Sequence, residues 1–316
     1  MGRTLLIADE GETAVRIARA AAELGWRSLA LREMLDERTP HGACPDAGLV
    51  LEAAARADAG LVHPGRGALS LDARFARRCA RADLTLIGPP PDVLETITDR
   101  GRMRALAGAV GVPVPPGPAD PVSWEEAEAF LASLRGQAVL LRPASPPGRT
   151  GACVVEDPAG LRRLRARWAA SGTVRDVYVE EFVERTARVE VQTVGDGRLV
   201  AHLWERQPLR RGSDAPRWQA PAAGLPAPTR FLLLDAAMRL AGAMPYRGVS
   251  TMTFLLTPTR RFFLTRVDPH LHSGHSVTER LAGLDLFATQ LRLARGDTIR
   301  DLGLEEHLRP SLPLPG

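Results

Sequence analysis

The feature that most limits the fold is the alternation of short apolar segments with helical segments over the first 90 residues. Apolar runs at 5–8 and 28–31 flank the stretch 14–24, in which apolar residues recur at helical spacing. Two later apolar runs, 57–63 and 84–87, each end at a glycine or a proline. Buried strands that alternate with helices are typical of a parallel sheet, so the sequence predicts a small parallel α/β domain.

The pattern changes after a helical segment expected at 99–110. A proline-rich stretch at 112–121 indicates a linker, and 123–135 is expected to form a helix with an acidic first turn. Further strands and helices are expected beyond it: strands at 138–141, 152–156, 176–182 and 188–194, a helix at 159–170, a helix from 231, two strands joined at Pro258-Thr259, and a helix from 277. This order indicates a second, α+β domain.

Length and composition exclude several classes of protein. A chain of 316 residues can form two or three domains, and it contains no run of about 20 apolar residues such as a membrane span needs. Cys44, Cys79 and Cys153 are too scattered for a disulfide framework or a CxxC metal site, which fits a reducing compartment. The net charge of +4 comes without a basic stripe. We therefore expect a cytoplasmic protein that binds neither membranes nor nucleic acid.

The sequence contains no lysine, so all 41 basic residues in the Lys+Arg count are arginine. Chemistry that needs a lysine is excluded. A GC-rich genome would account for the replacement of lysine by arginine. It would not account for the replacement of aspartate or glutamate by other residues.

Five short strings occur in one order along the chain. They are IADEGETAVRI at 7–17, HPGRGALS at 63–70, IGP at 87–89, GVP at 111–113, and VTER from 277, with a glycine at 296. Together they resemble the biotin carboxylase family of ATP-grasp enzymes, whose matching strings include IANRGEIAVRI, HPGYGFLS and VTE. The order and spacing hold from about residue 3 to residue 300.

The resemblance implies a domain organisation. A Rossmann-like pre-ATP-grasp domain is expected at 1–92 and an α+β ATP-grasp domain at 93–300, with a lid at about 119–183 and a tail at 301–316. In the family a further C-terminal domain follows, so we expect this chain to lack it.

The resemblance also implies a candidate ATP site with altered residues. The two family lysines that clamp phosphates fall at Arg100 and Arg142. Arginine keeps the charge, although its planar head does not reproduce a compact ammonium. The family hinge, (V/M)EKYL, whose backbone recognises adenine, falls on Glu180, Phe182 and Val183. The same residues also fit the continuation of a core strand.

The metal-binding acids of the family are replaced. The acid of GTxEF falls at Thr253, and in the following E-x-N the acid falls at Arg266 and the asparagine at Asp268. Mg²⁺ needs hard oxygen ligands, and a cation at 266 repels it. We expect no metal, and the residues that remain leave ATP without Mg²⁺ as the candidate ligand of this site. One alternative is that Arg100, Arg142 and Arg266 converge on a single anion in a metal-free site.

The positions that carry the family's carboxylation chemistry are changed as well. The family string RxQVEH reads His270 to His275, which puts His270 at the arginine that stabilises the biotin enolate and Gly274 at the general base. The flexible glycine run whose N–H groups hold the phosphates in the family falls at 144–151. Here Pro146 and Pro147 remove backbone N–H donors from this turn. The QRRHQK block at 209–215 keeps only its two arginines. We therefore expect no catalytic residues.

Three of the seven histidines, His270, His272 and His275, lie within six residues, which makes a metal site conceivable. In a strand, 270 and 272 share a face. Without a nearby acid or thiol, we favour neutral histidines that line the site over a set of metal ligands.

Two hypotheses for function follow. The first is a catalytically inactive biotin-carboxylase-like protein that acts as a binding or regulatory partner of an acyl-CoA carboxylase or a biosynthetic enzyme. The second is a divergent ATP-grasp ligase that uses the arginines for ATP and another acceptor. The family often forms dimers, so a homodimer is compatible with either.

Overall fold

The computed structural model describes residues 3–34, 46–144, 151–171, 174–184, 186–209 and 217–310. The chain divides into two compact units, one formed by residues 1–98, 188–254 and 266–316, the other by residues 99–187 and 255–265. None of the described helices combines the length and the apolar character needed to cross a membrane.

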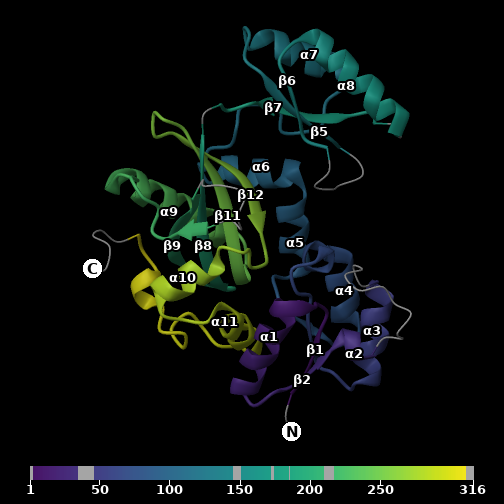
Figure 1. Cartoon of the computed structure of the whole chain (residues 1–316), viewed down its shortest axis with the longest axis vertical. Coiled ribbons are helices and arrows are strands. Elements are labelled where there is room, and N and C mark those ends of the chain that lie inside the picture. The colour runs from purple at the N-terminus through teal and green to yellow at the C-terminus, as the bar shows by residue number, and fades with distance from the viewer. Residues whose placement is uncertain are drawn as a thin grey trace. The chain divides into compact units, whose positions relative to one another are not determined.

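The first unit begins with a parallel sheet whose strand order is β2-β1-β3-β4. Its strands are β1 (Thr4–Ile7), β2 (Arg27–Ala30), β3 (Leu61–His63) and β4 (Thr85–Leu86). Its helical elements are α1 (Gly11–Glu23), α2 (Leu31–Met34), α3 (Ala47–Arg56), the 3₁₀ helix η1 (Ala68–Leu71), α4 (Ala73–Arg81) and α5 (Pro91–Thr98). The helices pack apolar faces onto the sheet, as the alternation of segments predicts (Figure 1).

The first unit also contains residues 188–254 and 266–268 of a five-stranded sheet with the order β10-β9-β8-β11-β12. Its strands are β8 (Ala187–Asp196), β9 (Val200–Leu209), β10 (Arg217–Gln219), β11 (Arg247–Leu256) and β12 (Phe262–Asp268). The helices α9 (Ala227–Gly242), α10 (His275–Ala282) and α11 (Leu286–Arg295) accompany it, with α11 beside α1, and η2 (Glu305–His307) follows (Figure 1). One apolar core joins Leu5 and Ile17 to Val194, Leu271 and Phe287.

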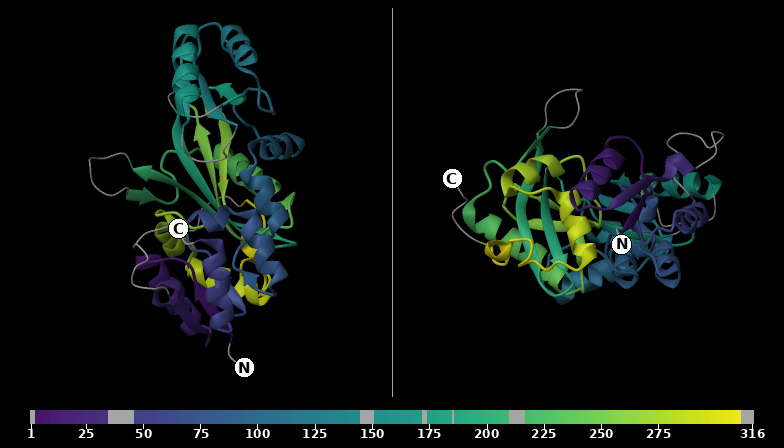
Figure 2. Two further views of the ribbon diagram at one scale, coloured as in Figure 1. Left: turned by 90° about the vertical axis from the view of Figure 1, so that its right-hand side faces the viewer. Right: turned by 90° about the horizontal axis from the view of Figure 1, so that it is seen from below.

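The second unit contains a three-stranded antiparallel sheet with the order β6-β5-β7. Its elements are α6 (Arg100–Ala109), α7 (Trp124–Ser133), β5 (Val139–Pro143), β6 (Cys153–Val155), α8 (Pro158–Ser171) and β7 (Val177–Glu181). A capping box formed by Ser123 and Glu126 starts α7. The two teal helices α7 and α8 cover one face of this sheet (Figure 2). Between them, the rings of Trp124 and Trp168 are in edge contact.

The predicted fold class is confirmed: a parallel α/β part is combined with antiparallel ATP-grasp-type sheets. The expected strands and helices correspond to observed ones, with shifted ends. The strands β9 and β10 were not predicted. The boundaries of the proposed domains, lid and tail stay predictions.

Candidate functional site

Polar side chains gather on one face of the five-stranded sheet. Because side chains alternate along a strand, Glu190 and Gln192 of β8 face one way while Val189 and Val191 face the apolar core. Thr251 of β11 lies on the same face as Gln192. All of these side chains are buried, so their polar atoms need partners inside the protein.

Arg206 of β9 supplies those partners. Its side chain is completely buried, and its Nε donates to Oε2 of Glu190 at 3.0 Å. Its Nη1 donates to Oε1 of Gln192 at 2.7 Å and to the hydroxyl of Thr278 in α10 at 3.0 Å. A buried guanidinium is tolerated only when it is paired and hydrogen-bonded in this way. Arg206 therefore ties three elements of the unit together.

Trp218 of β10 closes this cluster over Gly274. The guanidinium of Arg206 lies 5.6 Å from the centre of the Trp218 ring, within cation–π distance. A Cβ atom placed on Gly274 would lie 2.5 Å from Cδ2 of Trp218 and 2.9 Å from Nε of Arg206. The indole therefore fills the space into which any side chain at 274 would extend. At this position, where the resemblance places the family's general base, no side chain fits without movement of the ring.

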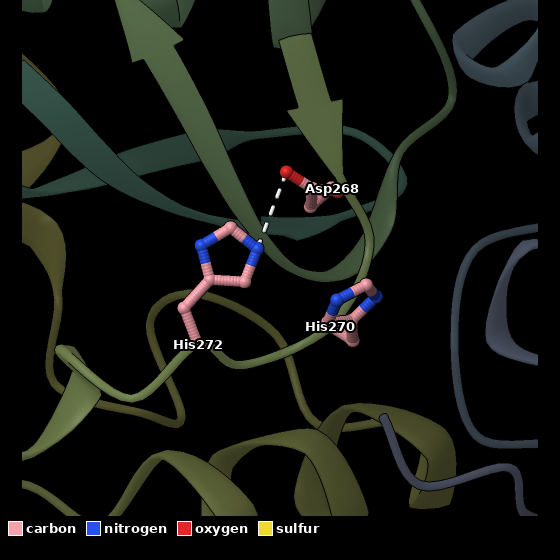
Figure 3. A group of neighbouring side chains, drawn as sticks. All are labelled: Asp268, His270 and His272. Carbon is pink, nitrogen blue, oxygen red and sulfur yellow. Dashed lines mark ion pairs between the residues drawn. The ribbon is translucent and has the colours of Figure 1, made fainter. Parts of the chain in front are cut away.

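A second group of charges lies at the end of β12. His272 is placed between two carboxylates, with Nε2 3.2 Å from Oδ2 of Asp268 and Nδ1 3.5 Å from Oε1 of Glu190. Arg266 approaches the same carboxylate, with Nε 2.5 Å from Oδ2 of Asp268. Its Nη2 also lies 3.3 Å from Nε2 of His272. A second histidine, His270, completes the group (Figure 3).

The charges of this group reinforce each other. Burial alone would raise the pKa of Glu190, but the hydrogen bond with His272 and the nearby Arg206 and Arg188 outweigh it and lower that pKa to about 2. The pKa of Asp268 is also lowered, because His272 and Arg266 overcome the effect of burial. Burial opposes the charged form of His272, yet its two carboxylate partners raise its pKa. The cluster therefore holds two ionised carboxylates.

These residues do not fit the Mg²⁺-binding part of an ATP site. The resemblance places the three ligand positions of the family motif at Thr253, Arg266 and Asp268. Thr253 is buried and offers a hydroxyl, and Arg266 is a cation that already forms an ion pair with Asp268. Two divalent ions with phosphates need several carboxylate oxygens, and Asp268 alone supplies one carboxylate among the three positions.

The remaining candidate residues belong to the second unit. Arg100, at the start of α6, forms an ion pair with Glu180 of β7, and Arg104 donates to the same carboxylate oxygen at 3.2 Å. Phe182 follows β7, and its N–H donates to the carbonyl of Ala138 at 2.9 Å. Val183 comes directly after it. The expected hinge therefore lies at the end of a paired strand. This position also fits the alternative that these residues continue a core strand.

Arg142 lies in β5, paired in register with Tyr178 of β7. Within the described residues, Arg100 and Arg266 each contact a carboxylate of their own unit. The convergence of the three arginines on one anion stays a prediction. Residues 145–150 of the proline-rich cradle and residues 210–215 of the QRRHQK block lie outside the described residues.

Comparison with known proteins places the chain in a family. It matches the family described as carbamoyl-phosphate synthase L chain, ATP binding domain, over residues 99–302, and biotin carboxylase, N-terminal domain, over residues 1–94. Biotin carboxylase 2 of Bacillus subtilis (strain 168) is 31% identical over 318 residues, which cover 93% of this chain and 71% of that protein. The chain belongs to the biotin carboxylase family.

Other relatives are longer carboxylases or domains of carboxylases. Pyruvate carboxylase of Aspergillus niger is 34% identical over 331 residues, and the chain spans only 27% of its length. Among solved structures, the biotin carboxylase domain of a single-chain bacterial carboxylase is 37% identical with a TM-score of 0.84, covering 99% of this chain and 72% of that one. The corresponding domain of Hydrogenobacter thermophilus 2-oxoglutarate carboxylase is 27% identical with a TM-score of 0.86, covering 98% and 73%.

Sequence reasoning missed several residues that shape this biotin-carboxylase-like site. Arg206 and Trp218 lie on the two unpredicted strands, and Glu190 lies on a predicted strand without having been singled out. The alternation of Glu190 and Gln192 with valines was a signal for a polar face. The premise that the histidines have no acid nearby was wrong, because Asp268 lies among them.

Proposed function

We propose that this chain is a catalytically inactive biotin-carboxylase-like protein that acts as a binding or regulatory partner of an acyl-CoA carboxylase or a biosynthetic enzyme. The observation that carries the proposal is Trp218, whose ring fills the space beside Gly274 where the family motif has its general base. Glycine cannot abstract a proton, and the filled space leaves no room for a neighbouring base to replace it.

The charges at the end of β12 support the same proposal. Arg266 neutralises Asp268, the one carboxylate among the three ligand positions of the family motif. A guanidinium cannot coordinate Mg²⁺, so arginine at position 266 removes an oxygen ligand that Mg²⁺ requires. The site therefore lacks both the base for bicarbonate and the ligands for Mg²⁺-ATP.

The partnership is supported by the known relatives. The H. thermophilus 2-oxoglutarate carboxylase domain was solved as a dimer, and another similar chain is a single-chain, multi-domain long-chain acyl-CoA carboxylase. This chain shares the fold of the H. thermophilus domain, with a TM-score of 0.86. We expect it in the cytoplasm, paired with a carboxylase subunit or with a second copy of itself.

Nucleotide titration separates this proposal from a divergent ATP-grasp ligase. Isothermal titration of the purified chain with ATP, with and without Mg²⁺, is expected to show no metal-dependent gain in affinity. The double variant Thr253→Glu, Arg266→Glu restores two carboxylates and is expected to gain Mg²⁺-dependent ATP binding without gaining biotin carboxylation. Tight Mg²⁺-ATP binding by the unmodified chain, together with hydrolysis, would establish the ligase instead.

The regulatory role has its own test. The chain carrying an affinity tag is expressed in its native host at its natural level, and co-purifying proteins are identified by mass spectrometry. Recovery of acyl-CoA carboxylase or related biosynthetic subunits is the expected result. If carboxylase activity in extracts is unchanged by deletion and by overexpression of the chain, the regulatory role is wrong.

A further inference from the structure

Asp268, His270 and His272 form a compact group of possible metal ligands after β12. Each offers one ligand atom, and these atoms all lie within 4.8 Å of one another (Figure 3). Asp268 ends β12, and bends at Pro269 and His270 turn the chain directly after it, which brings His270 and His272 back beside the carboxylate of Asp268. The intervening Leu271 is 2% exposed and packs into the main apolar core. The chain therefore presents the three polar side chains together.

We propose that these three side chains bind one divalent transition metal ion, with Zn²⁺ as the reference ion. Two imidazole nitrogens and one carboxylate oxygen are a donor set that suits Zn²⁺ and related ions. Mg²⁺ prefers oxygen ligands in octahedral geometry and is not suited to this set. The proposed site shares only Asp268 with the positions of the family's Mg²⁺ motif.

The distances are close to those that a tetrahedral ion requires. With bonds of about 2.0–2.1 Å, two ligand atoms of tetrahedral Zn²⁺ lie roughly 3.3 Å apart. Oδ2 of Asp268 and Nε2 of His272 are already 3.2 Å apart. The rings of His270 and His272 have centroids 5.2 Å apart, so a modest rotation of His270 closes the set. Three protein ligands leave a fourth position for water.

Neighbouring groups hold the histidines as metal sites require. Ligating histidines commonly place their second ring nitrogen against a carboxylate or another oxygen, which fixes the orientation of the ring. Nδ1 of His272 lies 3.5 Å from the buried carboxylate of Glu190. Nδ1 of His270 lies 3.2 Å from the hydroxyl of Ser70. These contacts of the second ring nitrogens favour a set of metal ligands, independently of how close the three ligand atoms lie to one another.

Arg266 occupies the place of the ion in the present structure. Its guanidinium contacts both Oδ2 of Asp268 and Nε2 of His272. Its side chain is 38% exposed, whereas that of Asp268 is 5% exposed. On metal binding, the guanidinium therefore turns toward solvent while the carboxylate stays, and the ion takes over its charge. Arg266 competes with the metal and sets its affinity.

Metal titration of the whole chain tests the proposal without relying on any enzymatic activity. The chain is freed of metal by dialysis against a chelator and titrated with Co²⁺, whose visible absorption reports tetrahedral coordination, and with Zn²⁺ by calorimetry. One ion per chain is expected. Arg266→Gln removes the competing cation and is expected to bind at least 10-fold more tightly.

Two further variants decide whether the named residues are responsible. His272→Asn is expected to weaken binding at least 100-fold, while His307→Asn, a histidine outside the group, is expected to leave it unchanged. Circular dichroism checks that each variant folds. The proposal is overturned if the unmodified chain binds neither ion, or if a folded His272→Asn variant binds both as the unmodified chain does. Neither result bears on the proposed loss of carboxylation.

Discussion

Replacing Arg206 by methionine should destabilise the protein strongly. The guanidinium is completely buried and forms an ion pair with Glu190, which is also completely buried. Methionine fills much of the volume, but it removes the guanidinium that pairs with this carboxylate. It also removes the Arg206 hydrogen bonds to Gln192 and Thr278. Breaking a buried ion pair by removing one partner typically costs about 3–5 kcal/mol.

A matched variant at Arg188 separates the cost of breaking the buried ion pair from a general effect of lost charge. Arg188 also pairs with Glu190, but its side chain is 43% exposed. Solvent screens such a pair, so Arg188→Met is expected to cost no more than about 1 kcal/mol. The double variant Arg206→Met, Glu190→Gln removes the uncompensated charge and is expected to lose less stability than Arg206→Met alone.

Urea unfolding at pH 7.5, followed by circular dichroism and tryptophan fluorescence, gives the free energies of unfolding for all four proteins. Coincidence of the two probes checks that unfolding is two-state. The reasoning is refuted if Arg206→Met loses less than about 1 kcal/mol, or if Arg188→Met loses as much as Arg206→Met.

Three other predictions concern separate parts of the chain. Burial lowers the pKa of His63 and of His202 to about 4, so the folded state keeps both neutral, and the stability they contribute is complete above pH 6.5 and is lost as the pH falls toward 4. At pH 5 each should cost about 2 kcal/mol, and urea unfolding of His202→Asn should show a correspondingly smaller acid loss. Gly274→Ala should lower the melting temperature because its Cβ meets Trp218, and adding Trp218→Ala should recover part of the loss. Glu180→Gln should also lower the melting temperature, because it removes the buried partner of two arginines.

The fold could be predicted largely because local patterns and tertiary structure agree. The segments that became β1 and β3 are short and apolar and end at turn residues, and the helix α1 shows its buried side in the spacing of its apolar residues. Family strings then fixed the order of the remaining elements. The strand β9 was not predicted because charged residues such as Glu205 and Arg206 are typical of exposed positions. In the structure both are buried, Glu205 in an ion pair with Arg230 and Arg206 in an ion pair with Glu190.

The site could be predicted only in part, for a physical reason. The residue types at Thr253, Arg266 and Gly274 are visible in the sequence, and they indicate what chemistry is lost. What replaces that chemistry depends on contacts between distant residues, such as Trp218 with Gly274. Asp268, by contrast, is two residues from His270, so its nearness in the sequence could have revealed the histidine–aspartate group.

The central claim is that this member of the biotin carboxylase family does not carboxylate biotin. The most direct test measures ATP hydrolysis by the purified chain in the presence of Mg²⁺ and bicarbonate, with and without free biotin, beside an active biotin carboxylase as a positive control. The account predicts no increase on addition of biotin and no formation of carboxybiotin from labelled bicarbonate. Saturable, biotin-dependent hydrolysis that yields labelled carboxybiotin would contradict it.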